Sequence, residues 1–161
     1  MPGAKRSLMR QLLVRSRRPE ETEQLGCALG EAAFAGCVIG LTGPLGAGKT
    51  VLAQGIARGL GVADPVTSPT FVYVRIHHGR LPFYHVDLYQ ISRIEEAESL
   101  GLDELLAGDS VVAIEWPERI AAWLPSVRLD VLIQQADGDR VIELSATDPE
   151  HMGLIRAAAG A

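Results

Sequence analysis

Apolar residues along this chain form two patterns: short continuous runs, typical of buried strands, and positions three or four apart, typical of helices. Segment 37–42 is a short apolar run, and the apolar positions of segment 51–60 recur at helical spacing. Similar segments follow one another over most of the sequence. They predict strands at 11–16, 37–42, 71–77, 83–88, 111–114, 127–134 and 140–145, and helices from Pro19, after Gly48, over 94–106 and at 120–123.

Strands interleaved with helices predict an α/β fold. We expect a single domain of three layers, with a mixed, mostly parallel central sheet between helices. Turn-forming residues at 78–80 and 136–139 predict two antiparallel hairpins at its margins. Because ligands of such sheets bind at the carboxyl ends of the central strands, candidate functional residues are sought there.

Length and composition fit one globular domain, which we place at residues 11–146. The chain has 161 residues, of which 47% are apolar and 22% charged. Its longest apolar stretch, at 32–41, is too short to cross a bilayer, so we expect a cytoplasmic protein without a membrane segment. Cys27 and Cys37 lack the spacing of a metal or redox site and are expected to be reduced.

Charge is unevenly distributed along the chain. The first 18 residues carry a charge of +6 and the remainder −11. A basic leader at 1–10 could contact RNA or an acidic protein, but no aromatic residues lie between its charges, so we favour a solvated, partly disordered leader. The acidic body argues against direct nucleic-acid binding. The tail at 147–161 is expected to be a frayed helix or disordered.

The segment 43–50 fits the phosphate-loop pattern G-x-x-x-x-G-K-[ST] and lies between a predicted strand and a predicted helix. Its glycines allow backbone N–H groups to face an anion, and the start of the next helix adds further donors. Lys49 would supply positive charge to the phosphates, and Thr50 a hydroxyl ligand for Mg²⁺. The residues expected to bind the nucleotide are Leu45, Gly46, Ala47, Gly48, Lys49 and Thr50.

Two acids follow predicted strands and are candidates for the metal and water chemistry that a phosphate loop alone lacks. Glu115 ends one apolar run in the Walker B position, and Asp87 ends another. Either could contact Mg²⁺ directly or through water. His85 is expected to be a hydrogen-bonded structural residue rather than a ligand, and Trp116 is either a core aromatic or a platform beside the nucleotide.

Three hydroxyl residues lie on the connector between the phosphate-loop helix and the next strand. They are Thr67, Ser68 and Thr70. Such connectors form mobile switches in many phosphate-loop proteins, but an ordinary turn held by side-chain hydrogen bonds explains the same residues.

Four ordered motifs, at 43–50, 66–71, 85–89 and 115–119, together resemble the bacterial TsaE family, the small ATPase of tRNA threonylcarbamoyladenosine synthesis. The resemblance implies a protein that binds and hydrolyses ATP with Mg²⁺. It also implies action with the TsaB and TsaD proteins, which modify an adenosine of tRNA, so that tRNA is an indirect partner.

At the matching positions, the resemblance implies that Lys49 holds the phosphates and that Thr50 and Glu115 hold Mg²⁺. Asp87 would organise the metal or the attacking water. The residues implied for a switch are Thr67, Ser68 and Thr70, and those implied for contact with the base or sugar are Thr22 and Arg140.

Two other functions remain open at the level of sequence. A small-molecule kinase would share the phosphate loop, but the longest region that could form its lid, 92–109, is acidic rather than arginine-rich. A nucleotide-sensing module without hydrolysis is harder to exclude, since no arginine finger is evident. A GTPase is disfavoured because the sequence contains no Asn-Lys-x-Asp motif.

Overall fold

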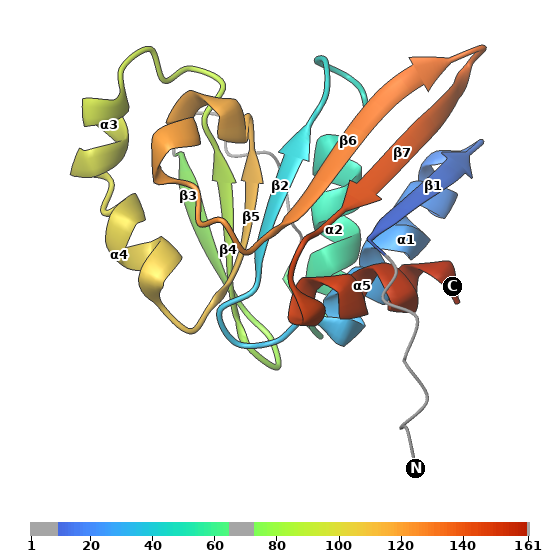
Figure 1. Ribbon diagram of the computed structural model, residues 1–161, viewed down its shortest axis with the longest axis horizontal. Helices are drawn as coiled ribbons and strands as arrows, with labels where there is room; N and C mark the ends of the chain where they lie inside the picture. The colour runs from blue at the N-terminus through green and yellow to red at the C-terminus, as the bar shows by residue number, and fades with distance from the viewer. Residues whose placement is uncertain (1–9, 65–72, 161) are drawn as a thin grey trace.

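The computed structural model describes residues 10–64 and 73–160, and its central feature is one mixed β-sheet (Figure 1). The strand order is β1-β7-β6-β2-β5-β4-β3. The strands are β1 (Gln11–Ser16), β2 (Val38–Thr42), β3 (Val74–His78), β4 (Pro82–Asp87), β5 (Val111–Glu115), β6 (Leu129–Ala136) and β7 (Asp139–Ser145).

Strands β6, β2, β5 and β4 are parallel to one another and form the centre of the sheet. The remaining pairings, β1 with β7, β7 with β6 and β3 with β4, are antiparallel. Strand β5 is buried along its whole length, as expected for a strand covered on both faces. The predicted mixed sheet with a parallel centre is therefore confirmed.

Helices cover both faces of the sheet and make the outer two of the three predicted layers (Figure 1). On one face lie α1 (Pro19–Ala32), α2 (Lys49–Gly59) and α5 (Pro149–Ala159). On the other lie α3 (Ile94–Ser99), α4 (Leu102–Ala107) and the 3-10 helix η1 (Pro117–Trp123). No helix among the described residues is long and apolar enough to cross a membrane.

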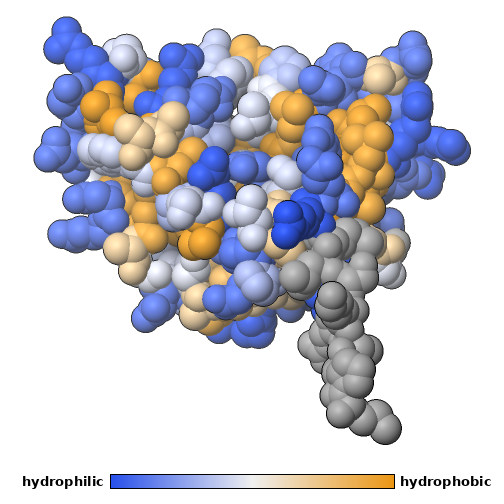
Figure 2. All heavy atoms as spheres, viewed as in Figure 1, coloured by the Kyte–Doolittle hydropathy of each residue, from blue (hydrophilic) through white to orange (hydrophobic). Residues whose placement is uncertain are grey.

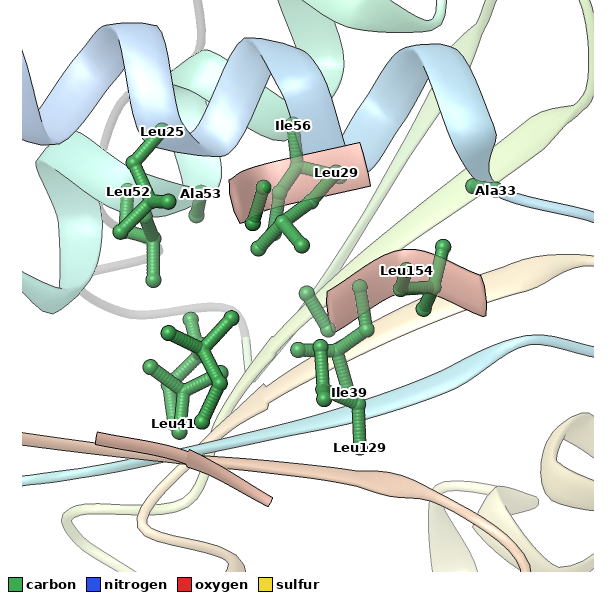
Figure 3. Close-up of a cluster of buried hydrophobic side chains, with 14 of the residues drawn as sticks. Leu25, Leu29, Ala33, Ile39, Leu41, Leu52, Ala53, Ile56, Leu129 and Leu154 are labelled. Carbon is green, nitrogen blue, oxygen red and sulfur yellow. The ribbon is translucent and has the colours of Figure 1, made fainter. Parts of the chain in front are cut away.

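The larger core lies between the sheet and the layer of α1, α2 and α5. Figure 3 shows Leu29 of α1 and Ile56 of α2 facing Ile39 of β2, with Leu154 of α5 beside them. All four side chains are at most 1% exposed. On the opposite face, no helix among the described residues covers β6, β7 and β1, and Figure 2 shows apolar side chains there.

The end of the chain differs from the frayed or disordered tail expected from sequence. Asp148 caps α5, because its carboxylate accepts a hydrogen bond from the His151 backbone N–H. The helix then buries one apolar side against the core. Its buried apolar residues are Met152, Leu154, Ile155 and Ala158. The basic leader lies outside the described residues, apart from Arg10.

Helices α1 and α2 contact each other backbone to backbone through glycines. Two glycines on α1, Gly26 and Gly30, face two on α2, Gly55 and Gly59, and each pair is spaced four residues apart. A Cβ at Gly30 would overlap the Ile56 carbonyl oxygen, and one at Gly55 would lie 2.9 Å from the Cα of Gly26. The two helices can approach this closely only because these positions have no side chain.

We expect Gly30→Ala to lower the free energy of unfolding by about 3 kcal/mol, because the new methyl group forces the two helix backbones apart. Chemical denaturation followed by circular dichroism measures this change. The matched control is Gly153→Ala on α5, where a Cβ meets nothing within 4 Å. That variant should be about 0.5 to 1 kcal/mol more stable than wild type, since alanine favours helix over glycine. Equal effects of the two substitutions would contradict the close helix contact.

Candidate functional site

The phosphate loop connects β2 to α2 at the carboxyl end of the parallel strands. Gly48 is the residue before the helix and has a φ of 109°, a left-handed conformation that favours glycine. At the start of the loop, a Cβ on Gly43 would lie 2.5 Å from the Ile133 carbonyl oxygen. The loop residues at both ends are therefore glycine for steric reasons, and the N-terminus of α2 faces the loop.

Lys49 folds back over this loop and is only 5% exposed. Its ammonium donates hydrogen bonds to the carbonyl oxygens of Gly43 and Pro44 and lies 4.3 Å from the centre of the Trp116 ring. Burial lowers the pKa of Lys49, while the nearby carboxylates, first among them Glu115, raise it in part. The loop thus holds a positive charge at its mouth, close to an aromatic face.

The two predicted acids lie side by side at the ends of neighbouring parallel strands. Asp87 of β4 pairs in register with Glu115 of β5. Both carboxylate oxygens of Glu115 are 3.3 Å from the Thr50 hydroxyl, which donates toward them. Glu115 also contacts Nε2 of the buried His85 at 2.6 Å. Asp87 accepts a hydrogen bond from the Tyr89 backbone N–H.

These groups line one cavity of about 430 Å³. Its polar lining comes from the loop, the start of α2 and the ends of β4 and β5. Of the predicted site residues, the structure places the following around it: Leu45, Gly46, Ala47, Gly48, Lys49, Thr50, Asp87, Glu115 and Trp116. Residues that are far apart in sequence therefore line one cavity at the carboxyl ends of the parallel strands.

A second cavity, of about 220 Å³, lies on the other side of the loop and contains Thr22 and Arg140. Arg140 of β7 donates hydrogen bonds to the carbonyl oxygens of Ala47 and Gly46. Thr22 of α1 is 2% exposed and hydrogen-bonds to the Ser16 hydroxyl. Both residues are thus beside the loop, while their contact with a base or sugar stays a prediction.

Comparison of the sequence with known protein families identifies the family of this chain. A family model described as threonylcarbamoyl adenosine biosynthesis protein TsaE matches residues 16–142. The chain belongs to the TsaE family. The matched segment contains the phosphate loop, both acids, Thr22 and Arg140.

Relatives named tRNA threonylcarbamoyladenosine biosynthesis protein TsaE align over most of their length. The protein of Bacillus subtilis is 41% identical over 140 residues, covering 86% of this chain and 87% of that protein. That of Treponema pallidum is 38% identical over 131 residues, covering 81% and 97%. A crystal structure of Bacillus subtilis YdiB superposes with a TM-score of 0.80 at 34% identity, covering 93% of this chain and 95% of that one.

Several residues at this TsaE site were not predicted. Tyr73, Tyr89 and Gln90 also line the larger cavity. The Tyr89 ring lies 5.1 Å from that of Trp116, centre to centre. Tyr89 and Gln90 lie two and three residues after Asp87, the last residue of β4, so their position after a central strand was a usable signal. The predicted switch residues Thr67, Ser68 and Thr70 lie outside the described residues.

The donor groups at the site suit Mg²⁺ better than a softer metal. In the part of the chain described here, no group of three or more His, Cys, Asp and Glu residues could hold a metal ion by itself. The larger cavity instead offers the Thr50 hydroxyl and the carboxylates of Glu115 and Asp87. Mg²⁺ is commonly held by one or two carboxylates together with the phosphates of a substrate, which fits this TsaE site.

Proposed function

We propose that this chain is the Mg²⁺-dependent, ATP-binding and ATP-hydrolysing component of tRNA N6-threonylcarbamoyladenosine synthesis, acting with TsaB and TsaD in the cytoplasm. Membership of the TsaE family supports the pathway. The observation that carries the enzymatic proposal is the meeting of Lys49, Thr50, Asp87 and Glu115 at one cavity. These are the groups that phosphoryl transfer from a nucleotide requires.

Each residue has a distinct part in the proposed reaction. Backbone N–H groups of the loop and of the start of α2 bind the phosphates, and the ammonium of Lys49 exchanges its loop carbonyl partners for phosphate oxygens. Thr50 and Glu115 would hold Mg²⁺, which when bound neutralises charge that develops on the phosphates. Asp87, beside Glu115, orients the attacking water or the water bound to the metal.

Partner dependence is proposed because the larger cavity is short of positive charge. Lys49 is the only cationic side chain among the described residues that line it. Arg140 lies on the other side of the loop, where its guanidinium is bonded to loop carbonyls. An arginine supplied in trans can raise the rate of such reactions by about 10³ to 10⁵. A partner protein would provide that group or reorder the site.

We expect slow phosphate release from ATP by the isolated protein and a faster rate when TsaB and TsaD are added. A phosphate-release assay measures both, with EDTA as the metal-free control. The rate should fall to background in EDTA, because Thr50 and Glu115 would then have no ion to position. A measurable rate that the partners leave unchanged would contradict partner dependence. Release at background with and without partners would favour a nucleotide-sensing module, and phosphate transfer to a metabolite would favour a kinase.

We expect Lys49→Ala to reduce tRNA modification in a reconstituted system by about 10²-fold or more, since it removes a charge aimed at the phosphates. Incorporation of labelled threonine into tRNA measures the product. Arg156→Ala is the matched control, because it removes an exposed positive charge on α5, outside both cavities at the loop. Full modification by Lys49→Ala would overturn the proposed role of ATP.

A further inference from the structure

His85 contacts the carboxylate of Glu115, the proposed metal ligand, from the protein interior. Its side chain is fully buried on β4, two residues before Asp87, and its Nε2 lies 2.6 Å from Oε2 of Glu115. Alternation along β4 puts His85 on the same face of the sheet as Phe83 and Asp87. Because β4 and β5 are neighbours in parallel register, this face also carries Glu115.

The surroundings of the ring determine which nitrogen carries the proton. An ionised carboxylate only accepts hydrogen bonds, so the His85 Nε2 must be the donor to Glu115. The other nitrogen, Nδ1, is buried and has no hydrogen-bond partner in residues 10–64 and 73–160. A proton on Nδ1 would be a buried donor without an acceptor, which is costlier than an unused lone pair. The arrangement therefore places the ring proton on Nε2.

The ring itself has little freedom to turn. His85 stacks against Phe83, with ring centres 6.4 Å apart and planes 15° apart, and Phe83 stacks in turn against His77 of β3. Phe83 is fully buried in the larger core. The direction of the Nε2–H bond is thus set by core packing rather than by the ligand site.

Glu115 needs such a constraint because glutamate has one more rotatable bond than the aspartate usual at this position. One carboxylate oxygen is fixed by His85, and the Thr50 hydroxyl approaches both. We propose that His85 is a positioning residue, whose Nε2–H holds the Glu115 carboxylate in the orientation that Mg²⁺ binding requires. This inference rests on the proposed function, because it concerns the same site.

The first test reads the proton directly, in the wild-type protein and without ligand. Two-bond ¹⁵N–¹H correlation spectra distinguish the two neutral tautomers of histidine, and comparison with His85→Gln assigns the signal. We expect the signal of a ring that carries its proton on Nε2. A ring protonated at Nδ1 would overturn the proposal, because its Nε2 could then not donate to Glu115.

The second test separates positioning from a structural role. Calorimetry measures ATP binding in EDTA and at increasing Mg²⁺. His85→Phe keeps a stacked ring but lacks the donor. We expect it to raise the Mg²⁺ concentration of half-maximal effect on ATP binding about tenfold or more, because removing a group that holds a metal ligand weakens metal binding by this much. ATP binding in EDTA should be unchanged, and His85→Gln, whose side-chain amide can donate in place of Nε2, should recover most of the loss.

The matched control is His77→Phe, since His77 is a buried histidine of the same stack, and its Nε2 has no hydrogen-bond partner among the described residues, Glu115 included. Its Mg²⁺ concentration of half-maximal effect should equal that of the wild type. Equal shifts for the two variants, or equal loss of metal-free and metal-dependent binding in His85→Phe, would overturn the positioning role. Wild-type binding that is insensitive to Mg²⁺ would instead overturn the proposed function and this inference together, whatever tautomer the spectra show.

Discussion

The backbone contact between α1 and α2 determines where the phosphate loop lies relative to the first helix. A Cβ added at Gly26 or Gly30 of α1 would overlap the carbonyl oxygen of Leu52 or Ile56 of α2, so the two backbones approach as closely as glycine allows. Glycines spaced four apart serve this purpose in membrane helices, and here they do so beside an apolar core in water. Lys49 begins α2 and Thr22 lies on α1. This contact therefore fixes the position of Thr22 relative to the phosphate loop, and with it the relative position of the two cavities at the loop.

The parallel centre of the sheet supplies the second constraint on the site. Parallel strands end at the same edge, so Asp87 and Glu115 meet without any loop having to place them. The backbone positions of both acids are therefore fixed by β4 and β5. Two aromatic residues of the cavity, Tyr89 and Trp116, lie in the segments that follow these strands. Trp116 adopts a left-handed backbone conformation with a φ of 61° directly after β5. That conformation turns the chain out of β5 at the point where its ring meets Lys49.

Sequence alone predicted the strands, the layers and most of the larger cavity because those features depend on local periodicity and on a motif of fixed spacing. It did not predict the order of the strands, and the contact of His85 with Glu115 depends on that order, since β4 must lie beside β5. The glycine pairs were visible four residues apart, but which residues they face depends on how two helices cross. The apolar spacing of α5 was present in the sequence too, although a frayed or disordered tail was expected there.

The balance of charge in the larger cavity explains why a metal ion and a partner belong together in the proposed function. Lys49 faces Glu115 and Asp87, so the described side chains that line the cavity bring more negative than positive charge to the place where phosphates would bind. A nucleotide triphosphate would add further negative charge, which the loop N–H groups and the α2 N-terminus offset only in part. Mg²⁺ bound by Glu115 and Thr50 would convert the unfavourable carboxylate into a ligand, so that binding becomes favourable. Charge that develops in the transition state would then be met by Mg²⁺ and by Lys49, which is the only cationic side chain among the described residues lining this cavity. A cation from a partner protein would add to them without weakening the resting site.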